Sequence, residues 1–164
     1  MEQTNIFIDD QWHVRLADFG LAGFADATLA THTSTHAGSI RWMAPELHNP
    51  ELFDIDGTRR TKASDVYSFA CVVLEVRCCL PPHGTILSFS KLHTLNYPFS
   101  DISRDSTVIW KVMNGERPPR PVLEVLDDFL WAVVEECWRQ HPSHRPEMEV
   151  VVERTTQLSS NEFF

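Results

Sequence analysis

Asn5 and Asp18 are polar residues that flank the first two apolar runs of the chain. They offer an amide oxygen and a carboxylate, which are the hard oxygen ligands that Mg²⁺ prefers. Two short apolar runs between them, at residues 6–8 and 13–17, predict two strands joined by the polar turn Asp9-Asp10-Gln11. A strand–turn–strand of this length would bring both ligands to the same end of the hairpin. Taken singly, each residue is explained equally well as a turn asparagine and a loop aspartate.

The elements that follow this hairpin predict a mainly α fold. Apolar residues recur at helical spacing in four segments: 64–76, 106–114, 123–139 and the stretch that Pro146 opens. The first segment is apolar nearly all round, which predicts a buried helix, and Ser64 could cap it. Gly115 should end the second helix, and the three prolines of the GERPPRP segment exclude a helix immediately after it.

The composition excludes several classes of protein. A net charge of −9 and a pI near 5.3 argue against a nucleic-acid or anionic-membrane partner. No apolar run is long enough to cross a bilayer and the polar start MEQTN is not a signal peptide, so we expect the cytosol or nucleus. The cysteines form no CxxC pair, which favours reduced thiols at Cys71, Cys78, Cys79 and Cys137.

Four separate motifs together resemble a protein kinase catalytic domain. Asp18-Phe19-Gly20 and Ala44-Pro45-Glu46 read DFG and APE, the two ends of the kinase activation segment, here 18–46. Residues 62–69 are similar to the start of the long central kinase helix, and residues 137–148 match a CWxxxPxxRPxM pattern. Residues 38–46, which we call the substrate loop, contain a hydroxyl at Ser39 and the sequence WMAPE. These two features favour the tyrosine-kinase-like group of Ser/Thr kinases.

The resemblance implies roles for the residues of the ATP and metal site. Asn5 and Asp18 would hold Mg²⁺, and Asp18, Phe19 and Gly20 would lie at the nucleotide. Ser39 and Trp42 would seat a protein substrate whose Ser or Thr hydroxyl accepts the phosphate.

The resemblance also implies roles in the architecture. Glu46 and Arg145 would form a buried ion pair, and Asp65 would accept backbone hydrogen bonds from a catalytic loop. The hydroxyls of the loop at residues 21–39 are possible phosphorylation sites, at Thr31, Thr33, Ser34 and Thr35. A loop rich in Thr and Ser is equally explained as an ordinary solvated loop.

Several kinase motifs are missing from the 164 residues. There is no GxGxxG loop, no phosphate-pairing lysine strand and no HRD before Asn5. We therefore expect a truncated domain at 1–158 without the N-terminal lobe, followed by a tail at 159–164. This chain alone should be inactive and should not bind ATP and Mg²⁺. The alternatives are a non-catalytic, pseudokinase-like binding module and a gene-model fragment without a role of its own.

The truncation has an expected structural consequence. Helices upstream of Asn5 would normally pack on the central helix, so its apolar wall at Val66, Phe69 and Val73 should face water. Such a patch invites aggregation or a partner chain that covers the exposed helices.

Residues 76–96 fit the kinase pattern poorly. After Glu75 a brief turn should lead to Pro98-Phe99, but a segment without periodicity and with mixed Cys, Pro and apolar residues intervenes. It is either a functional insertion or a retained intron. The second explanation predicts a spliced transcript that joins Glu75 nearly to Tyr97.

Overall fold

The computed structural model describes residues 6–11, 13–16, 40–55, 57, 59–77, 97–120 and 127–161. Residues 78–96, which form most of the atypical segment, lie outside these ranges. The same holds for the predicted metal, nucleotide, substrate and phosphorylation sites at Asn5, Asp18, Phe19, Gly20, Thr31, Thr33, Ser34, Thr35 and Ser39.

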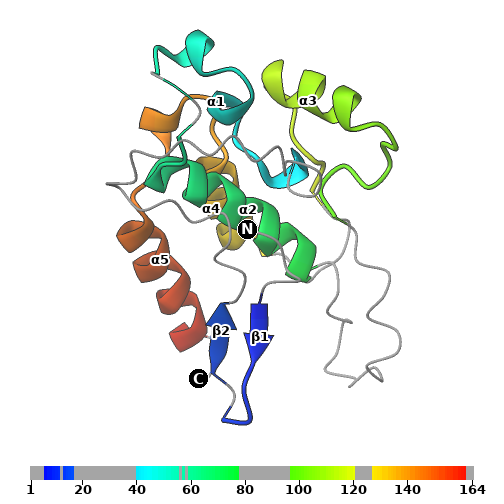
Figure 1. Cartoon of the computed structure of the whole chain (residues 1–164). Helices are drawn as coiled ribbons and strands as arrows, with labels where there is room; N and C mark the ends of the chain where they lie inside the picture. The colour runs from blue at the N-terminus through cyan, green and yellow to red at the C-terminus, as the bar shows by residue number, and fades with distance from the viewer. Residues whose placement is uncertain are drawn as a thin grey trace.

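The described part is mainly helical, with one small hairpin at one end (Figure 1). Its strands are β1 (Ile6–Ile8) and β2 (Val14–Leu16). Its helices are η3 (Ile40–Trp42), α1 (Pro45–His48), η4 (Pro50–Phe53), α2 (Lys62–Arg77), α3 (Asp105–Met113), α4 (Asp128–Cys137), η6 (Pro142–His144) and α5 (Met148–Asn161).

The two strands pair antiparallel, and Ile6 lies opposite Leu16. Asp9 fixes the turn because its carboxylate accepts the backbone N–H groups of Gln11 at 3.0 Å and His13 at 2.9 Å. These backbone bonds, that of His13 first, lower the pKa of Asp9. The Ile6–Leu16 pairing puts the chain ends that lead toward Asn5 and Asp18 at the same end of the hairpin.

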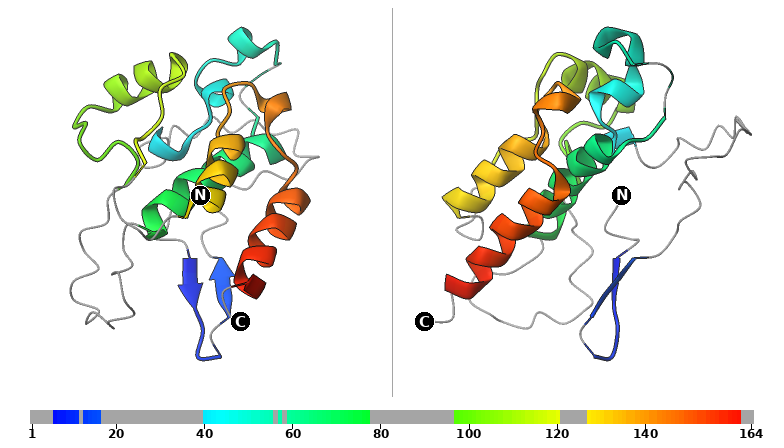
Figure 2. Two further views of the ribbon diagram at one scale, coloured as in Figure 1. Left: turned by 180° about the vertical axis from the view of Figure 1, so that it is seen from behind. Right: turned by 90° about the vertical axis from the view of Figure 1, so that its left-hand side faces the viewer.

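Helix α2 runs through the middle of the helical part, with α4 packed along it (Figure 2). Its buried side chains join those of the substrate loop, α3, α4 and α5 in one core. Val66 is 1 % exposed, so the expectation that it faces water is wrong, and Phe69 and Val73 are half-buried against the same core. Burial on nearly all sides agrees with the predicted all-round apolar sequence of this helix.

The predicted cap of α2 is wrong by one helical turn. Thr61 precedes the first helical residue, and its hydroxyl accepts the N–H of Ser64 at 3.2 Å. The Ser64 hydroxyl in turn accepts the N–H of Thr61 at 2.9 Å. This is a reciprocal capping box in which Ser64 occupies the place usually held by Glu or Gln. Both hydroxyls are needed, so neither alone marks the helix start.

Other helix ends also differ from the predicted limits. Helix α4 begins at Asp128 because the carboxylate of Asp127 caps it, accepting the N–H of Leu130 at 2.6 Å. It ends at Cys137 rather than at residue 139. Helix α5 begins at Met148, two residues after Pro146, and ends at Asn161. Caps and local hydrogen bonds decide these ends, whereas apolar periodicity only locates the helix body.

Gly115 ends α3 as predicted. It has a φ of +81°, in the left-handed region that favours glycine. Its N–H donates to the Val112 carbonyl at 3.1 Å, and the N–H of Glu116 donates to the Lys111 carbonyl at 2.9 Å. These two bonds form a Schellman motif, which satisfies the last carbonyls of the helix.

Cys71 and Cys137 lead to a prediction about alkaline stability. They are 1 % and 0 % exposed, and burial raises the pKa of each thiol to about 12. In the unfolded chain these thiols ionise near their ordinary pKa, so between about pH 9 and 12 the unfolded chain holds fewer protons than the folded one. Each thiol should therefore leave the free energy of unfolding unchanged below this window and lower it by about 1.4 kcal/mol per pH unit within it.

Urea unfolding at several pH values, followed by tryptophan fluorescence, checks this prediction. Cys71→Ala should remove the contribution of that thiol, so the free energy of unfolding should fall less steeply with pH above about pH 9 than in the unmodified chain. Tyr67, whose pKa burial also raises, should add to the decline only at the alkaline end. Equal slopes for the variant and the unmodified chain would contradict the assignment.

Candidate functional site

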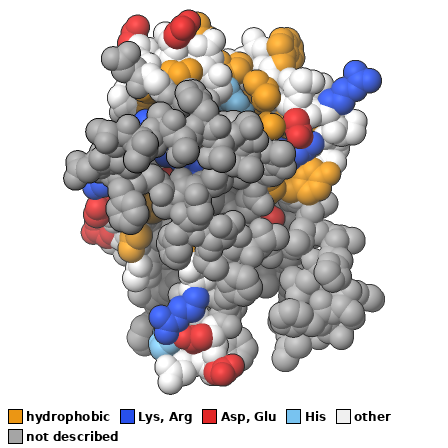
Figure 3. Space-filling model, viewed as in Figure 1, with side chains coloured by type: hydrophobic (Ala, Val, Ile, Leu, Met, Phe, Trp, Pro, Cys, Tyr) orange, Lys and Arg blue, Asp and Glu red, His pale blue; other side chains and the backbone are white. Residues whose placement is uncertain are grey.

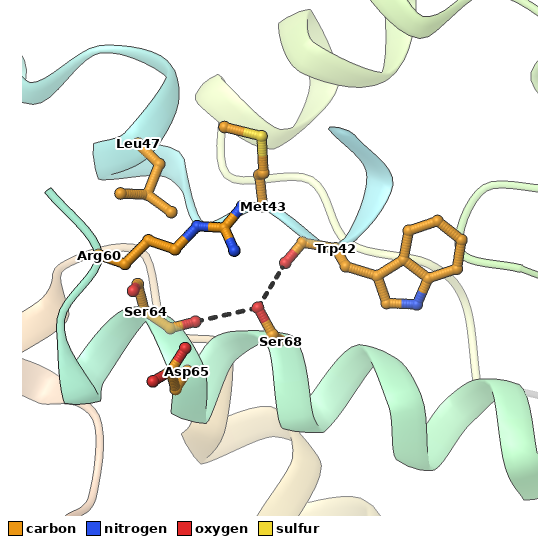
Figure 4. A pocket seen from close by; sticks show the side chains of 7 residues that line it. All are labelled: Trp42, Met43, Leu47, Arg60, Ser64, Asp65 and Ser68. Atoms are coloured by element: carbon orange, nitrogen blue, oxygen red, sulfur yellow. Dashed lines mark hydrogen bonds between the residues drawn. The ribbon is translucent and has the colours of Figure 1, made fainter. Parts of the chain in front are cut away.

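Trp42, one of the two predicted substrate-loop residues, is bound to α2 through both its side chain and its backbone carbonyl, and Figure 4 shows the backbone contact with Ser68. The side chain is buried, and its Nε1–H donates to the Glu75 carboxylate at 3.1 Å. Its backbone carbonyl accepts the Ser68 hydroxyl at 2.9 Å, and that hydroxyl also lies 3.1 Å from the Ser64 carbonyl. The described part of the substrate loop is thus attached to the central helix of the core.

Arg41 holds the other side of the substrate loop, and sequence reasoning missed it. Its guanidinium donates to the carbonyls of Phe99 at 2.7 Å and Ile102 at 2.8 Å, and more weakly to that of Pro98 at 3.3 Å. It also forms an ion pair with Asp105 at 2.9 Å, although the Arg41 side chain is only 11 % exposed. The sequence could have indicated this role, because Arg41 lies inside the apolar run IRWM. An arginine in such a run either finds hydrogen-bond acceptors or remains exposed.

The loop that Arg41 binds has an unusual backbone conformation. Phe99 has a φ of +57°, which bulky residues rarely adopt, and its side chain is buried. The Tyr97 ring lies 4.8 Å from the Arg41 guanidinium carbon, so the guanidinium is covered by a cation–π contact as well. Arg41 therefore connects the substrate loop to the segment that leads into α3.

Glu46 and Arg145 form the buried ion pair that the resemblance implies. The pair is bidentate, with N–O distances of 2.6 and 2.7 Å, and the two side chains are 2 % and 0 % exposed. Arg145 also donates to three backbone carbonyls, those of Ala63, Arg139 and Gln140. It thereby joins α1, the start of α2 and the segment after α4 at a single point.

A tyrosine ring lies against this ion pair, and no pattern in the sequence predicts this contact. The centroid of the buried Tyr67 ring lies 5.1 Å from the guanidinium carbon of Arg145 and 5.2 Å from that of Arg117. Arg117 itself donates to the Trp138 carbonyl at 2.9 Å and to the Gln140 side chain at 2.6 Å. The two arginines thus join helices α2 and α4 to the loops around them.

Asp65 is placed differently from the other predicted structural residues. It lies in the first turn of α2 and is exposed, and its carboxylate makes no hydrogen bond or ion pair within the described ranges. With Arg60 and the substrate loop it lines a small hollow of about 20 Å³ (Figure 4). The full lining is Trp42, Met43, Leu47, Arg60, Ser64, Asp65 and Ser68.

The residues predicted to bind metal carry donors of the type that Mg²⁺ prefers. Asn5 and Asp18 lie outside the described residues, but an amide oxygen and a carboxylate suit Mg²⁺. Within the described residues, no three His, Cys, Asp or Glu side chains gather as a metal site would require. Among the helices described, none has the length and apolar character needed to cross a membrane.

Comparison with known proteins assigns the family. The sequence matches the family described as protein tyrosine and serine/threonine kinase over residues 1–155. The chain belongs to this kinase family. Kinases of this family use ATP and Mg²⁺ and act on protein substrates, and the mainly helical fold described above agrees with the resemblance drawn from the sequence motifs.

Similar kinases come from distant organisms. Mitogen-activated protein kinase kinase kinase 7 of Homo sapiens is 29 % identical over 146 residues, which are 88 % of this chain and 19 % of that protein. Probable serine/threonine-protein kinase drkD of Dictyostelium discoideum is 30 % identical over 148 residues, 89 % of this chain and 9 % of that protein. Putative serine/threonine-protein kinase/receptor R818 of Acanthamoeba polyphaga mimivirus is 31 % identical over 152 residues, which are 93 % of this chain and 8 % of that protein. The chain spans a fifth or less of the length of these relatives.

Proposed function

We propose that this chain is the substrate-seating region of a protein kinase that transfers phosphate from ATP to Ser or Thr hydroxyls of proteins. The observation that carries the proposal is the double attachment of the substrate loop. Trp42 binds Glu75 and Ser68 of α2, and the Glu46–Arg145 pair holds the end of the same loop to the far side of the core. A rigidly held loop can position an acceptor hydroxyl, and positioning is a large part of the protein's contribution to phosphoryl transfer.

The roles of individual residues follow from the family. Asn5 and Asp18 would hold Mg²⁺, and Phe19 and Gly20 would adjoin the nucleotide. The metal would neutralise charge on the phosphates, and the protein residues would orient them. Ser39 favours a hydroxyl of Ser or Thr as acceptor, in keeping with the serine/threonine kinases among the relatives.

Two further roles belong to the same proposal. The exposed carboxylate of Asp65, which has no partner in the described ranges, would accept backbone N–H groups of a catalytic loop. Thr31, Thr33, Ser34 and Thr35 would be sites at which phosphorylation adds charge to the activation segment.

Phosphate transfer by the native protein that carries this chain tests the proposal. We expect transfer from radiolabelled ATP to Ser and Thr peptides and none to matched Tyr peptides. Asp18→Asn should lower the rate by roughly 10³-fold, because a metal contributes several kcal/mol to the transition state. Asp10→Asn, which removes a carboxylate at the exposed hairpin turn, is the matched control and should leave the rate unchanged.

The 164-residue chain alone provides the complementary measurement. It should show no thermal shift with ATP and Mg²⁺ and no transfer, because the sequence has no glycine-rich phosphate loop or phosphate-pairing lysine. A clear shift would contradict this account of the nucleotide site. A native protein that binds peptides but transfers no phosphate would favour the non-catalytic binding module instead.

A further inference from the structure

The hollow beside the substrate loop has room for the end of one side chain. Its volume of about 20 Å³ accommodates one water-sized group, which is too little for a cofactor. Buried Met43 and Leu47 form its apolar wall, and Ser64 and Ser68 of α2 line the opposite wall (Figure 4). Both serine hydroxyls already bond to backbone carbonyls, so the remaining polar capacity lies with the charged residues.

Arg60 is the cation at this hollow. It is exposed and makes no hydrogen bond or ion pair within the part of the chain that the structure describes. Figure 4 shows its side chain reaching across the hollow toward Met43, whereas Asp65 projects from α2 beyond Ser64. The two charges line one hollow without forming an ion pair. The donors of the Arg60 guanidinium are therefore available to an acceptor from another molecule.

Residues 59–62 contrast in charge with the protein as a whole. The whole chain has a net charge of −9, and acidic side chains recur at separate places on the face seen in Figure 3. Arg59, Arg60 and Lys62 nevertheless place three cations within four positions at the start of α2. The lining of the hollow carries one cation, Arg60, and one carboxylate, Asp65. Interactions at contact distance are screened less than those across the surface, so these nearby charges matter more to a bound group than the net charge of the chain.

We propose that Arg60 is a specificity-determining residue that selects protein substrates with a carboxylate side chain close to the acceptor hydroxyl. The carboxylate binds the Arg60 guanidinium at the mouth of the hollow, where apolar Met43 and Leu47 limit competition from water. This inference rests on the proposed function, in which the substrate loop seats a protein chain. The net charge by itself predicts the opposite preference, for basic substrates.

Peptide binding to the full chain without ATP tests the proposal. Fluorescent Ser-centred peptides differ only by Glu, Ala or Lys, placed at each neighbouring position in turn, and anisotropy gives the dissociation constants. At one position the Glu peptide should bind roughly threefold to tenfold tighter than the Lys peptide, as expected for an Arg–carboxylate pair that is partly exposed. Arg60→Gln should abolish this difference.

A matched control separates Arg60 from the general effect of charge. Arg104→Gln removes the same charge from an exposed residue before α3, outside the hollow, and should leave the Glu preference intact. Arg60→Glu should reverse the preference in favour of the Lys peptide, a gain of binding that an unfolded variant could not show.

Three results would overturn the inference: no measurable binding of any peptide, equal binding of the Glu and Lys peptides, or equal losses from Arg60→Gln and Arg104→Gln. Failure of the proposed function gives a different pattern. If binding depends on Arg60 but the native protein transfers no phosphate to the preferred peptide, the recognition stands and the phosphotransferase assignment fails.

Discussion

Replacing Arg145 with alanine should destabilise the folded chain by roughly 3–5 kcal/mol. Glu46 is 2 % exposed and both its oxygens accept from Arg145, so the variant would bury an uncompensated carboxylate. The carbonyls of Ala63, Arg139 and Gln140 would lose a donor as well. The urea midpoint of the chain, followed by tryptophan fluorescence, measures the effect.

Arg154 provides the matched control for this variant. It forms an ion pair with Glu136 at 2.9 Å, but the two side chains are 41 % and 31 % exposed. Arg154→Ala should therefore cost no more than about 1 kcal/mol. Arg145→Lys should recover only part of the loss, because lysine cannot donate two parallel bonds to a carboxylate.

A double-mutant cycle then isolates the interaction. Glu46→Ala combined with Arg145→Ala should be less destabilising than the sum of the two single changes, since neither charge is left unpaired. Additive effects, or an Arg145→Ala midpoint equal to that of Arg154→Ala, would show that the pair does not carry this part of the stability.

Replacing Arg41 with alanine should cost about 2–3 kcal/mol and should loosen one region in particular. The guanidinium is the donor for the carbonyls of Phe99 and Ile102, and Phe99 is buried. Without it, a left-handed Phe99 loses the contact that offsets its strained conformation. Because Arg41 adjoins Trp42, disorder in the 97–102 loop should reach the substrate loop.

Hydrogen exchange by mass spectrometry measures this local effect. In Arg41→Ala, amides of residues 97–108 should exchange faster, including that of Ile102, whose N–H donates to the Phe99 carbonyl at 2.9 Å. Amides of α4 should keep their protection. Arg104→Ala removes a neighbouring exposed arginine and should change neither exchange nor stability by more than about 0.5 kcal/mol. Unchanged protection in Arg41→Ala would refute the role assigned to Arg41.

The sequence by itself determined the family motifs and the bodies of the helices. The pairing of Glu46 with Arg145 spans 99 residues, and a family pattern implied it although no local rule could. The helix that became α2 was located because apolar residues on nearly all sides require burial, whatever the fold. Its start was misplaced because Thr61 and Ser64 cap it together, and single-residue preferences cannot reveal a reciprocal bond.

Only the tertiary structure decided the environment of Arg41, Tyr67 and Arg60. Arg41 has acceptors because the backbone of Phe99 turns its carbonyl toward the substrate loop, and that conformation depends on packing around residues far away in sequence. Tyr67 contacts Arg117 and Arg145 because the chain folds back after α3 and α4. Arg60 looks in the sequence like any surface arginine. It becomes a candidate for substrate recognition because distant residues build an apolar hollow beside it, and the strength of an electrostatic interaction depends on its surroundings.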